Sequence, residues 1–226
     1  MRRVAYYEHH TGKLKNPLTL AVVSDLHNES YDDIFPLIES ADALLVPGDI
    51  SDRYHQQWKQ GVSFLCDAAK RMPTFYSLGN HEVKQPDYFR LKKALYQTGA
   101  EILINRHVPF GEVLIGGWYD PDVVKEPERL SALEREEGVK ILLSHKPEEY
   151  WKRMRSRGFD LVIAGHAHGG QIRLGNQGVY APGQGLLPRL TRGRPDEKLI
   201  ISAGAGNPAR MPRWGNPCEV LLIHMD

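Results

Sequence analysis

Five apolar runs in this chain end in short clusters of polar residues, and this repetition constrains the fold more than any other feature. One run, Leu161–Ala164, continues as Gly-His-Ala-His-Gly-Gly-Gln and therefore leads into His166 and His168. An apolar, β-branched run of this length predicts a buried strand, and the glycines allow the chain to turn sharply where the strand ends. Side chains at positions i and i+2 of an extended backbone leave the same face. We therefore expect both histidines to point at one spot outside the sheet, as metal ligands would.

The other four runs also predict strands that carry polar residues just beyond their ends. Helical patterns separate most of the runs, and the clearest covers His55–Arg71, where the apolar side chains fall on one stripe. Alternating strands and helices predict an α/β fold, in which ligand sites lie at strand ends. In chain order the remaining clusters are Asp25-x-His27 after Leu18–Val23, Gly48-Asp49 after Ala43–Val46, Gly79-Asn80-His81-Glu82 after Thr74–Leu78, and His145 after Val139–Leu143.

Shorter patterns complete the set of expected elements. The stretch from Gly169 to Pro195 is rich in glycine and proline and predicts no regular element. Ser131–Glu134 fits a capping box that starts a brief helix. Further helices are predicted over Tyr31–Ser40, Pro86–Thr98 and Pro147–Arg157. Further strands are predicted over Val4–His9, Glu101–Leu103, Glu112–Gly116, Leu199–Ala203 and Glu219–His224.

Length and composition limit the classes of protein to which the chain can belong. Its 226 residues can bury the core of a single domain, which we expect to span residues 1–226. The formal net charge of +1 gives no electrostatic reason to expect a nucleic-acid partner. Cys66 and Cys218 lie far apart without a CxxC pairing, which favours free thiols in a reducing compartment. Because residues 1–16 lack the apolar core of a signal peptide and no run reaches the ~18 residues of a membrane span, we expect a cytoplasmic protein.

Taken in order, the five clusters resemble the motifs of the calcineurin-like metallophosphoesterase superfamily, which are DxH, GD, GNH[DE], a lone H and GHxH. Any one cluster alone is more often a turn or a helix cap, but the complete ordered set is specific. The resemblance implies a four-layer α/β/β/α sandwich of two mixed sheets flanked by helices. It also implies two metal ions and their ligands: Asp25, His27 and His168 for the first ion, Asn80, His145 and His166 for the second, and Asp49 as the bridge.

The chemistry of these side chains agrees with a pair of divalent transition-metal ions. Imidazole nitrogens combined with carboxylate and amide oxygens suit Mn, Fe, Co, Ni or Zn better than calcium, and we favour Mn. No thiolate marks a structural zinc site. Two such ions ~3.5–4 Å apart lower the pKa of a bridging water and clamp the oxygens of a phosphate ester. We therefore expect direct attack of a bridging hydroxide on phosphorus, without a covalent enzyme intermediate.

Three residues beside the expected ligands predict further roles in catalysis or substrate binding. In the superfamily, the histidine that matches His81 lies near the leaving-group oxygen, oriented by the acidic residue after it, which is Glu82 here. The alternative is that His81 only supports the metal ligands. Gly48–Arg53 is similar to the GDxxDR motif of protein Ser/Thr phosphatases, in which the arginine contacts phosphate. A solvated Arg53 is the alternative there.

Downstream segments are similar to a bacterial branch of membrane-associated phosphoesterases. Some members of that branch cleave the pyrophosphate of a nucleotide-linked lipid sugar. We therefore expect a small-molecule phosphodiester or pyrophosphate as substrate, with phosphomonoester or phosphoprotein hydrolysis as the second choice. A non-catalytic metal-binding or scaffold protein on the same fold is the alternative from another class. The segments that carry this resemblance are Gly169-Gly170-Gln171, Ala181–Leu186 and Asn216–Glu219.

The loop 186–194 raises the question of lipid contact, because three leucines and three arginines are interspersed in it. Such a loop either forms an amphipathic rim for a lipid-linked substrate or packs against the protein with its arginines in solvent. Peripheral contact with a membrane is therefore left open. Arg210, Arg213 and Trp214 pose the same question near the C-terminus, and Tyr119–Asp122 is a further polar loop of either kind.

Overall fold

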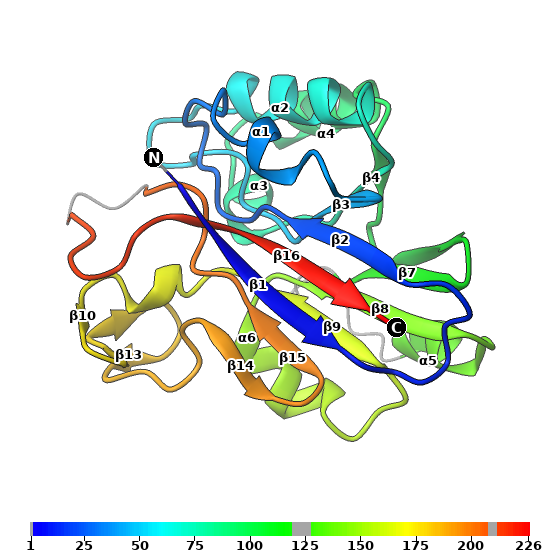
Figure 1. The fold of residues 1–226 in the computed structure, drawn as a ribbon. Helices are drawn as coiled ribbons and strands as arrows, with labels where there is room; N and C mark the ends of the chain where they lie inside the picture. Colours follow the sequence, from blue (N-terminus) through cyan, green and yellow to red (C-terminus); the bar gives the residue numbers. More distant parts are fainter. Residues whose placement is uncertain (1, 119–127, 208–211) are drawn as a thin grey trace.

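Two six-stranded mixed sheets pack face to face in the computed structural model, which describes residues 2–118, 128–207 and 212–226 (Figure 1). In the first sheet β2 to β5 run parallel, and in the second β7, β8, β9 and β15 do. The first sheet has the order β1-β16-β2-β3-β4-β5, formed by Arg3–His9, Glu219–Met225, Leu18–Val22, Ala43–Val46, Thr74–Tyr76 and Glu101–Ile102. The second has the order β14-β15-β9-β8-β7-β6, formed by Gly193–Asp196, Leu199–Ile201, Leu161–Ala164, Val139–Ser144, Val113–Trp118 and Arg106–Phe110.

The central strands are buried on both faces, which explains why their sequences are apolar throughout. In β2, Leu20 and Val22 pack into the core between the sheets, whereas Ala21 packs against the helices on the outer face. The outer face of the first sheet carries α1 (Phe35–Ile38), α2 (Lys59–Ala69) and α4 (Tyr88–Leu95). That of the second carries α5 (Glu128–Arg135), α6 (Pro147–Glu149) and the π-helical turn η1 (Tyr150–Met154). The architecture is thus the expected four-layer α/β/β/α sandwich.

The predicted helices are present, but the structure corrects their extent. The predicted helix His55–Arg71 reduces to α2, because Asp52 and Gln57 pair in an isolated bridge that holds the residues between them in a tight loop. Ser131 lies inside α5 and not at its start, so the predicted capping box is wrong. Beyond Glu149 the predicted α-helix continues as the wider η1 turn. Hydrophobic spacing alone does not distinguish an α-turn from a π-turn.

Several short strands escaped the sequence patterns. The edge strand β6 contains Pro109, which weakens any strand pattern. After the short 3-10 turn η2 (His168–Gly170), the chain forms two hairpins with two-residue strands, which are too short to show a period. The first hairpin pairs β10 (Arg173–Leu174) with β11 (Gln177–Gly178), and the second pairs β12 (Tyr180–Ala181) with β13 (Gly185–Leu186).

Some sequence features concern the membrane or lie where the structure is not described. Within the described ranges, the helices lack the combined length and hydrophobicity that a bilayer crossing requires. Cys66 and Cys218 are both free thiols, as expected. Tyr119–Asp122 and Arg210 lie outside the described residues.

Candidate metal centre

All seven candidate ligands are buried, and each follows the carboxyl end of a central strand. The first sheet contributes side chains after β2, β3 and β4, and the second contributes side chains after β8 and β9. Asn80 begins the one-turn helix α3 (Asn80–Val83). Parallel strands end at the same edge of a sheet, so two packed sheets bring both sets of loops together. The structure thereby joins residues that are up to 143 positions apart, from Asp25 to His168.

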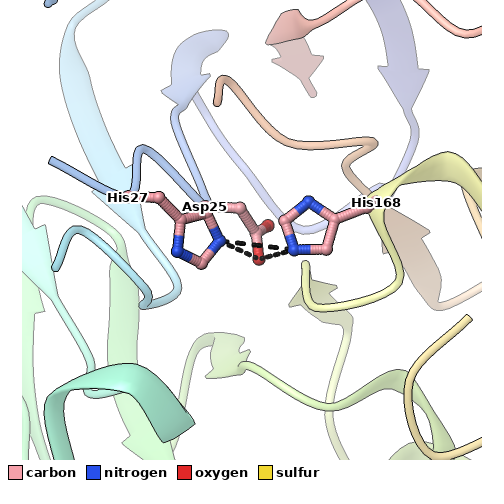
Figure 2. A group of neighbouring side chains, drawn as sticks. All are labelled: Asp25, His27 and His168. Atoms are coloured by element: carbon pink, nitrogen blue, oxygen red, sulfur yellow. Dashed lines mark hydrogen bonds and ion pairs between the residues drawn. The ribbon is translucent and has the colours of Figure 1, made fainter. Parts of the chain in front are cut away.

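Asp25, His27 and His168 form a first group with the spacing of a metal site. Figure 2 shows both imidazole rings turned toward the Asp25 carboxylate. The Asp25 Oδ1 atom lies 3.9 Å from His27 Nε2 and 3.7 Å from His168 Nε2. The two Nε2 atoms are 3.3 Å apart. These three atoms enclose a space in which one ion would contact all of them.

Asp49, His145 and His166 form a second group, and Asp49 also belongs to a third group with His27 and His81. The Asp49 Oδ2 atom is 3.0 Å from His145 Nε2, and the rings of His145 and His166 are 5.0 Å apart. Asn80 and His145 line the same small cavity. Asp49 therefore lies between the two predicted half-sites, where a bridging ligand has to be.

Backbone strain is concentrated in this centre. Five of the seven candidate ligands have a positive φ, a conformation that costs of order 1 kcal/mol or more for a residue other than glycine. The extended backbone expected for His166 and His168 is wrong: β9 ends at Ala164, and the two residues have φ of 68° and 46°. Because the chain turns at each of them, the two rings enter different groups instead of pointing at one spot.

Two glycines permit the loops to approach each other this closely. A Cβ atom on Gly79 would collide with the Asp49 carboxylate, and a Cβ atom on Gly165 would collide with that of Asp25. Each glycine directly precedes a candidate ligand in the sequence, Asn80 or His166. Glycine is required at both positions because a carboxylate from another segment of the chain lies where its side chain would be.

Glu82 fixes the backbone of the loops, which corrects the role suggested by the sequence. One carboxylate oxygen accepts hydrogen bonds from the backbone N–H groups of Asp49 (2.9 Å) and Gly79 (2.8 Å). The other accepts bonds from both the N–H and the hydroxyl of Ser51, each at 2.8 Å. Glu82 thus holds the strand ends of β3 and β4 together. Among the described contacts it makes no bond to the His81 ring, which the sequence predicted it would orient.

His81 is oriented by the loop that follows Asp49. Its Nδ1 atom accepts a hydrogen bond from the Arg53 N–H at 3.3 Å and lies 4.0 Å from Asp52 Oδ1. An Nδ1 that accepts leaves the proton of the neutral ring on Nε2. Its ring packs against those of His27 and Tyr54, with centroids 4.4 and 5.2 Å away. Burial lowers the His81 pKa, so the ring is neutral near pH 7.

Tyr54 is a residue that the sequence analysis missed, although it directly follows the GDxxDR-like segment. Its side chain is 63% exposed beside His81, and Arg53 Nη2 donates a hydrogen bond to its hydroxyl at 2.9 Å. The Arg53 guanidinium lies 4.8 Å from the centre of the Tyr54 ring. The Asp52 carboxylate fixes this loop by accepting from the Tyr54 N–H at 2.9 Å. Arg53 and Tyr54 therefore form a unit at the solvent side of His81.

Arg213 also belongs to the centre, although the sequence placed it only in a possible rim. Its Nη2 atom lies 3.2 Å from His168 Nδ1 and donates to the carbonyl oxygens of Ala203 (2.6 Å) and Gly206 (2.8 Å). An isolated arginine next to a tryptophan carries no signal for such a contact. Only the approach of the C-terminal segment to η2 creates it.

The pKa shifts separate the imidazoles by charge. Burial lowers the pKa of His27 and of His166 to about 3 and also lowers that of His168, so all three rings are neutral. Burial opposes charge on His145 as well, but the carboxylates of Asp49 and Asp25 outweigh it and raise the His145 pKa to about 9. Burial raises the pKa of Asp25 to about 6.

The donor set fits divalent metal ions. His27 Nδ1 donates to the carbonyl oxygen of Ser51 (3.2 Å) and His145 Nδ1 to that of Pro47 (2.9 Å), which points the Nε2 atom of each ring into the centre. Among the described residues, Asn80 Oδ1 is buried with no hydrogen-bond partner. A buried polar atom left without a partner is costly, and a coordinated ion would satisfy this oxygen.

Comparison with known proteins places the chain among metallophosphoesterases. It is 28% identical to an uncharacterized metallophosphoesterase of Campylobacter jejuni over 94% of this chain and 60% of the relative. It is 30% identical to the uncharacterized protein YpbG of Bacillus subtilis over 93% of this chain and 82% of the relative. An uncharacterized metallophosphoesterase of Helicobacter pylori is 29% identical over 92% of this chain and 58% of the relative.

The chain thus spans about 60% of the length of the Campylobacter relative. The model of the calcineurin-like phosphoesterase family matches residues 18–170, the range that contains all seven candidate ligands. With this match, the chain belongs to the calcineurin-like phosphoesterase family.

Proposed function

We propose that this protein is a phosphoesterase that uses two divalent metal ions to hydrolyse a phosphodiester or pyrophosphate bond. The observation that carries the proposal is the position of Asp49, which lies in ligand groups on both sides of the centre. Asp25, His27 and His168 would hold the first ion, and Asn80, His145 and His166 the second. Two ions bound there lower the pKa of a water and neutralise the charge of a phosphate ester. We favour Mn as the metal, because the ligands are imidazole, carboxylate and amide groups.

The chain's own residues account for the remaining requirements of such a reaction. His81 is grouped with His27 and Asp49 and carries its proton on Nε2, and this N–H can donate a hydrogen bond to the oxygen of the leaving group. Glu82 keeps the loops that carry Asp49 and Asn80 in register, because it binds the backbone before both. No side-chain nucleophile is required, and we propose that water attacks phosphorus in line with the leaving group.

The preference for a diester or pyrophosphate is supported by the surroundings of His81. A leaving group that carries a further organic substituent would extend past His81 toward the exposed Tyr54 ring. The runner-up is hydrolysis of a phosphomonoester or phosphoprotein, which the cationic Arg53 beside His81 favours because guanidinium binds phosphate well. A non-catalytic scaffold would gain nothing from strained ligands and an unpaired buried amide oxygen.

The experiment is a substrate panel with the metal-free protein reloaded with Mn. The panel contains an aryl phosphomonoester, a bis-aryl phosphodiester, cyclic nucleotides and nucleotide-sugar pyrophosphates. We expect the highest kcat/KM for a diester or a pyrophosphate. A higher kcat/KM for the monoester would select the runner-up, and metal binding without turnover of any substrate would select the scaffold. The free thiols favour the cytoplasm as the compartment.

A further inference from the structure

The two hairpins after η2 expose leucines in a way that the rest of the described chain does not. Leu174, Leu186 and Leu187 are 63%, 77% and 67% exposed, and they are the exposed large aliphatic side chains of the described residues. The other exposed large apolar residues there are aromatic. In the same loop Leu190 is only 8% exposed and packs into the core of the second sheet. The segment therefore buries one leucine and holds three in solvent.

The backbone keeps these leucines outward. Leu187 has a φ of 51°, which is unfavourable for a bulky residue, and its N–H donates to the Val179 carbonyl at 2.9 Å. Leu186 pairs directly with Tyr180 across the second hairpin, so both side chains lie on one exposed face. Strain that exposes an apolar side chain does not stabilise the fold and indicates a function outside it.

Aromatic side chains flank the leucines. The exposed Trp214 lies beside the first hairpin in space, because its backbone carbonyl accepts a hydrogen bond from the Arg173 N–H at 2.9 Å. Trp151 and Leu187 line the same open hollow of about 660 Å³ together with Arg189. Leucines bordered by tryptophan, tyrosine and arginine are typical of protein surfaces that lie in the interface of a bilayer.

The charge of this region selects the partner. Between Asp160 and Asp196 the sequence contains no acidic residue but four arginines, although the chain as a whole is nearly neutral. Of these, Arg173 is buried and donates to Gly169 and Thr191, so it adds no surface charge. Arg189 is exposed beside the leucines. A protein partner would need a broad flat patch of roughly 800 Å² per side, which two-residue strands do not offer. A fluid bilayer accepts a small projecting tip, and anionic lipid complements the exposed Arg189.

We propose that the hairpins bind the surface of an anionic lipid bilayer, with Leu174, Leu186 and Leu187 inserted among the headgroups. The hairpins begin directly after η2, which carries His168, and Val179 N–H donates to the Gly170 carbonyl of that turn. Insertion would therefore hold the metal centre close to the membrane. The proposal assigns a specific surface to the peripheral membrane contact that the sequence left open. Testing it does not require the protein to be active.

The test is co-sedimentation of the full chain with vesicles of phosphatidylcholine, alone or mixed with equal parts of phosphatidylglycerol. We expect the protein to bind the mixed vesicles. The double variant Leu186→Gln/Leu187→Asn should weaken binding about tenfold or more, because two leucines no longer enter the bilayer. Asn suits position 187 because it tolerates a positive φ. Arg189→Gln should weaken binding about fivefold, and only to the anionic vesicles.

Phe89→Gln is the matched control, since Phe89 is 86% exposed on α4, on the opposite side of the molecule from the hairpins (Figure 1). This variant should bind vesicles like the wild type. Light scattering identifies the competing occupant, a second copy of the chain. The proposal is overturned if the wild type does not sediment with mixed vesicles, if the double variant sediments equally, or if the wild type is a dimer that the double variant dissociates. Turnover of a soluble substrate should be unchanged in the double variant.

Discussion

The two halves of the candidate metal centre each contain two imidazoles, but they differ in the third side chain and in how they are prepared for an ion. In the first half, Asp25 faces two imidazoles that burial keeps neutral, and all three backbones are left-handed. In the second half, Asn80 brings no charge, and His145 holds a proton in its contact with Asp49. The strained backbone of the first half therefore already holds its three side chains in the positions that an ion would need. The second is closed by a proton that a metal ion has to displace.

The largest effect is expected from Asp49→Asn, because this residue serves both halves. An amide has one oxygen and no charge, so it would not bridge two ions. We expect kcat to fall by about a thousandfold, with at most one ion retained per chain. Activity assays and metal analysis check this, with Asp32→Asn on the surface as the control. A fully active Asp49→Asn protein would exclude the bridging role.

The proton on His145 predicts a difference in pH dependence between the halves. The His145 pKa is raised to about 9, so near neutral pH the ring is charged and must lose its proton to bind an ion. Affinity for the second ion should therefore rise about tenfold per pH unit up to about pH 9. Affinity for the first should change little above the Asp25 pKa of about 6. Calorimetric Mn titrations at several pH values measure both, and equal slopes would contradict the difference.

Glu82→Gln tests the element that both halves share. Glutamine offers one oxygen and turns an amide donor toward N–H groups that already donate. We expect a loss of about 2–4 kcal/mol in unfolding free energy and a ten- to hundredfold loss of metal affinity. Glu219→Gln is the control, since Glu219 is also buried and accepts from the Ala203 N–H, and its described contacts include no candidate ligand. Equal metal affinity in both variants would show that Glu82 is merely structural.

The smallest effect is expected at Tyr54, which lies beyond both halves. Tyr54→Ala should lower kcat/KM about five- to tenfold for a diester with an aryl leaving group and leave metal affinity unchanged. The effect should be absent for a methyl leaving group. Tyr96→Ala controls for the loss of an exposed tyrosine, because Tyr96 is 59% exposed at the end of α4. Steady-state kinetics with the aryl and methyl diesters decides whether Tyr54 contacts the leaving group.

Much of this centre could be predicted because its information is local. Leu18–Val22 and Leu161–Ala164 are continuous apolar runs, as strands buried on both faces must be, and their ends mark where the ligands lie. The sheet order places these ends together without any further signal. Predicting the strand ends was therefore sufficient to predict which candidate ligands lie together.

The parts that escaped prediction depend on contacts between distant segments. Arg213 reaches His168 only because the C-terminal segment crosses to η2. Glu82 accepts a hydrogen bond from the backbone N–H of Ser51, which lies 31 positions earlier in the sequence. The left-handed turns at His166 and His168 replace the expected extended chain because the loops are drawn into two ligand groups. Such strain is set by the surrounding structure and not by the residues that bear it.

Titration of the metal-free protein with Mn, with the rate of phosphodiester hydrolysis followed throughout, tests whether the reaction needs both ions. Two ions should bind per chain, and turnover should appear only as the second ion binds. The same titration of Asp49→Asn should show neither the second ion nor the rise in rate. Full activity with one ion per chain, or activity that persists in the metal-free protein, would contradict a reaction that depends on both halves of the centre.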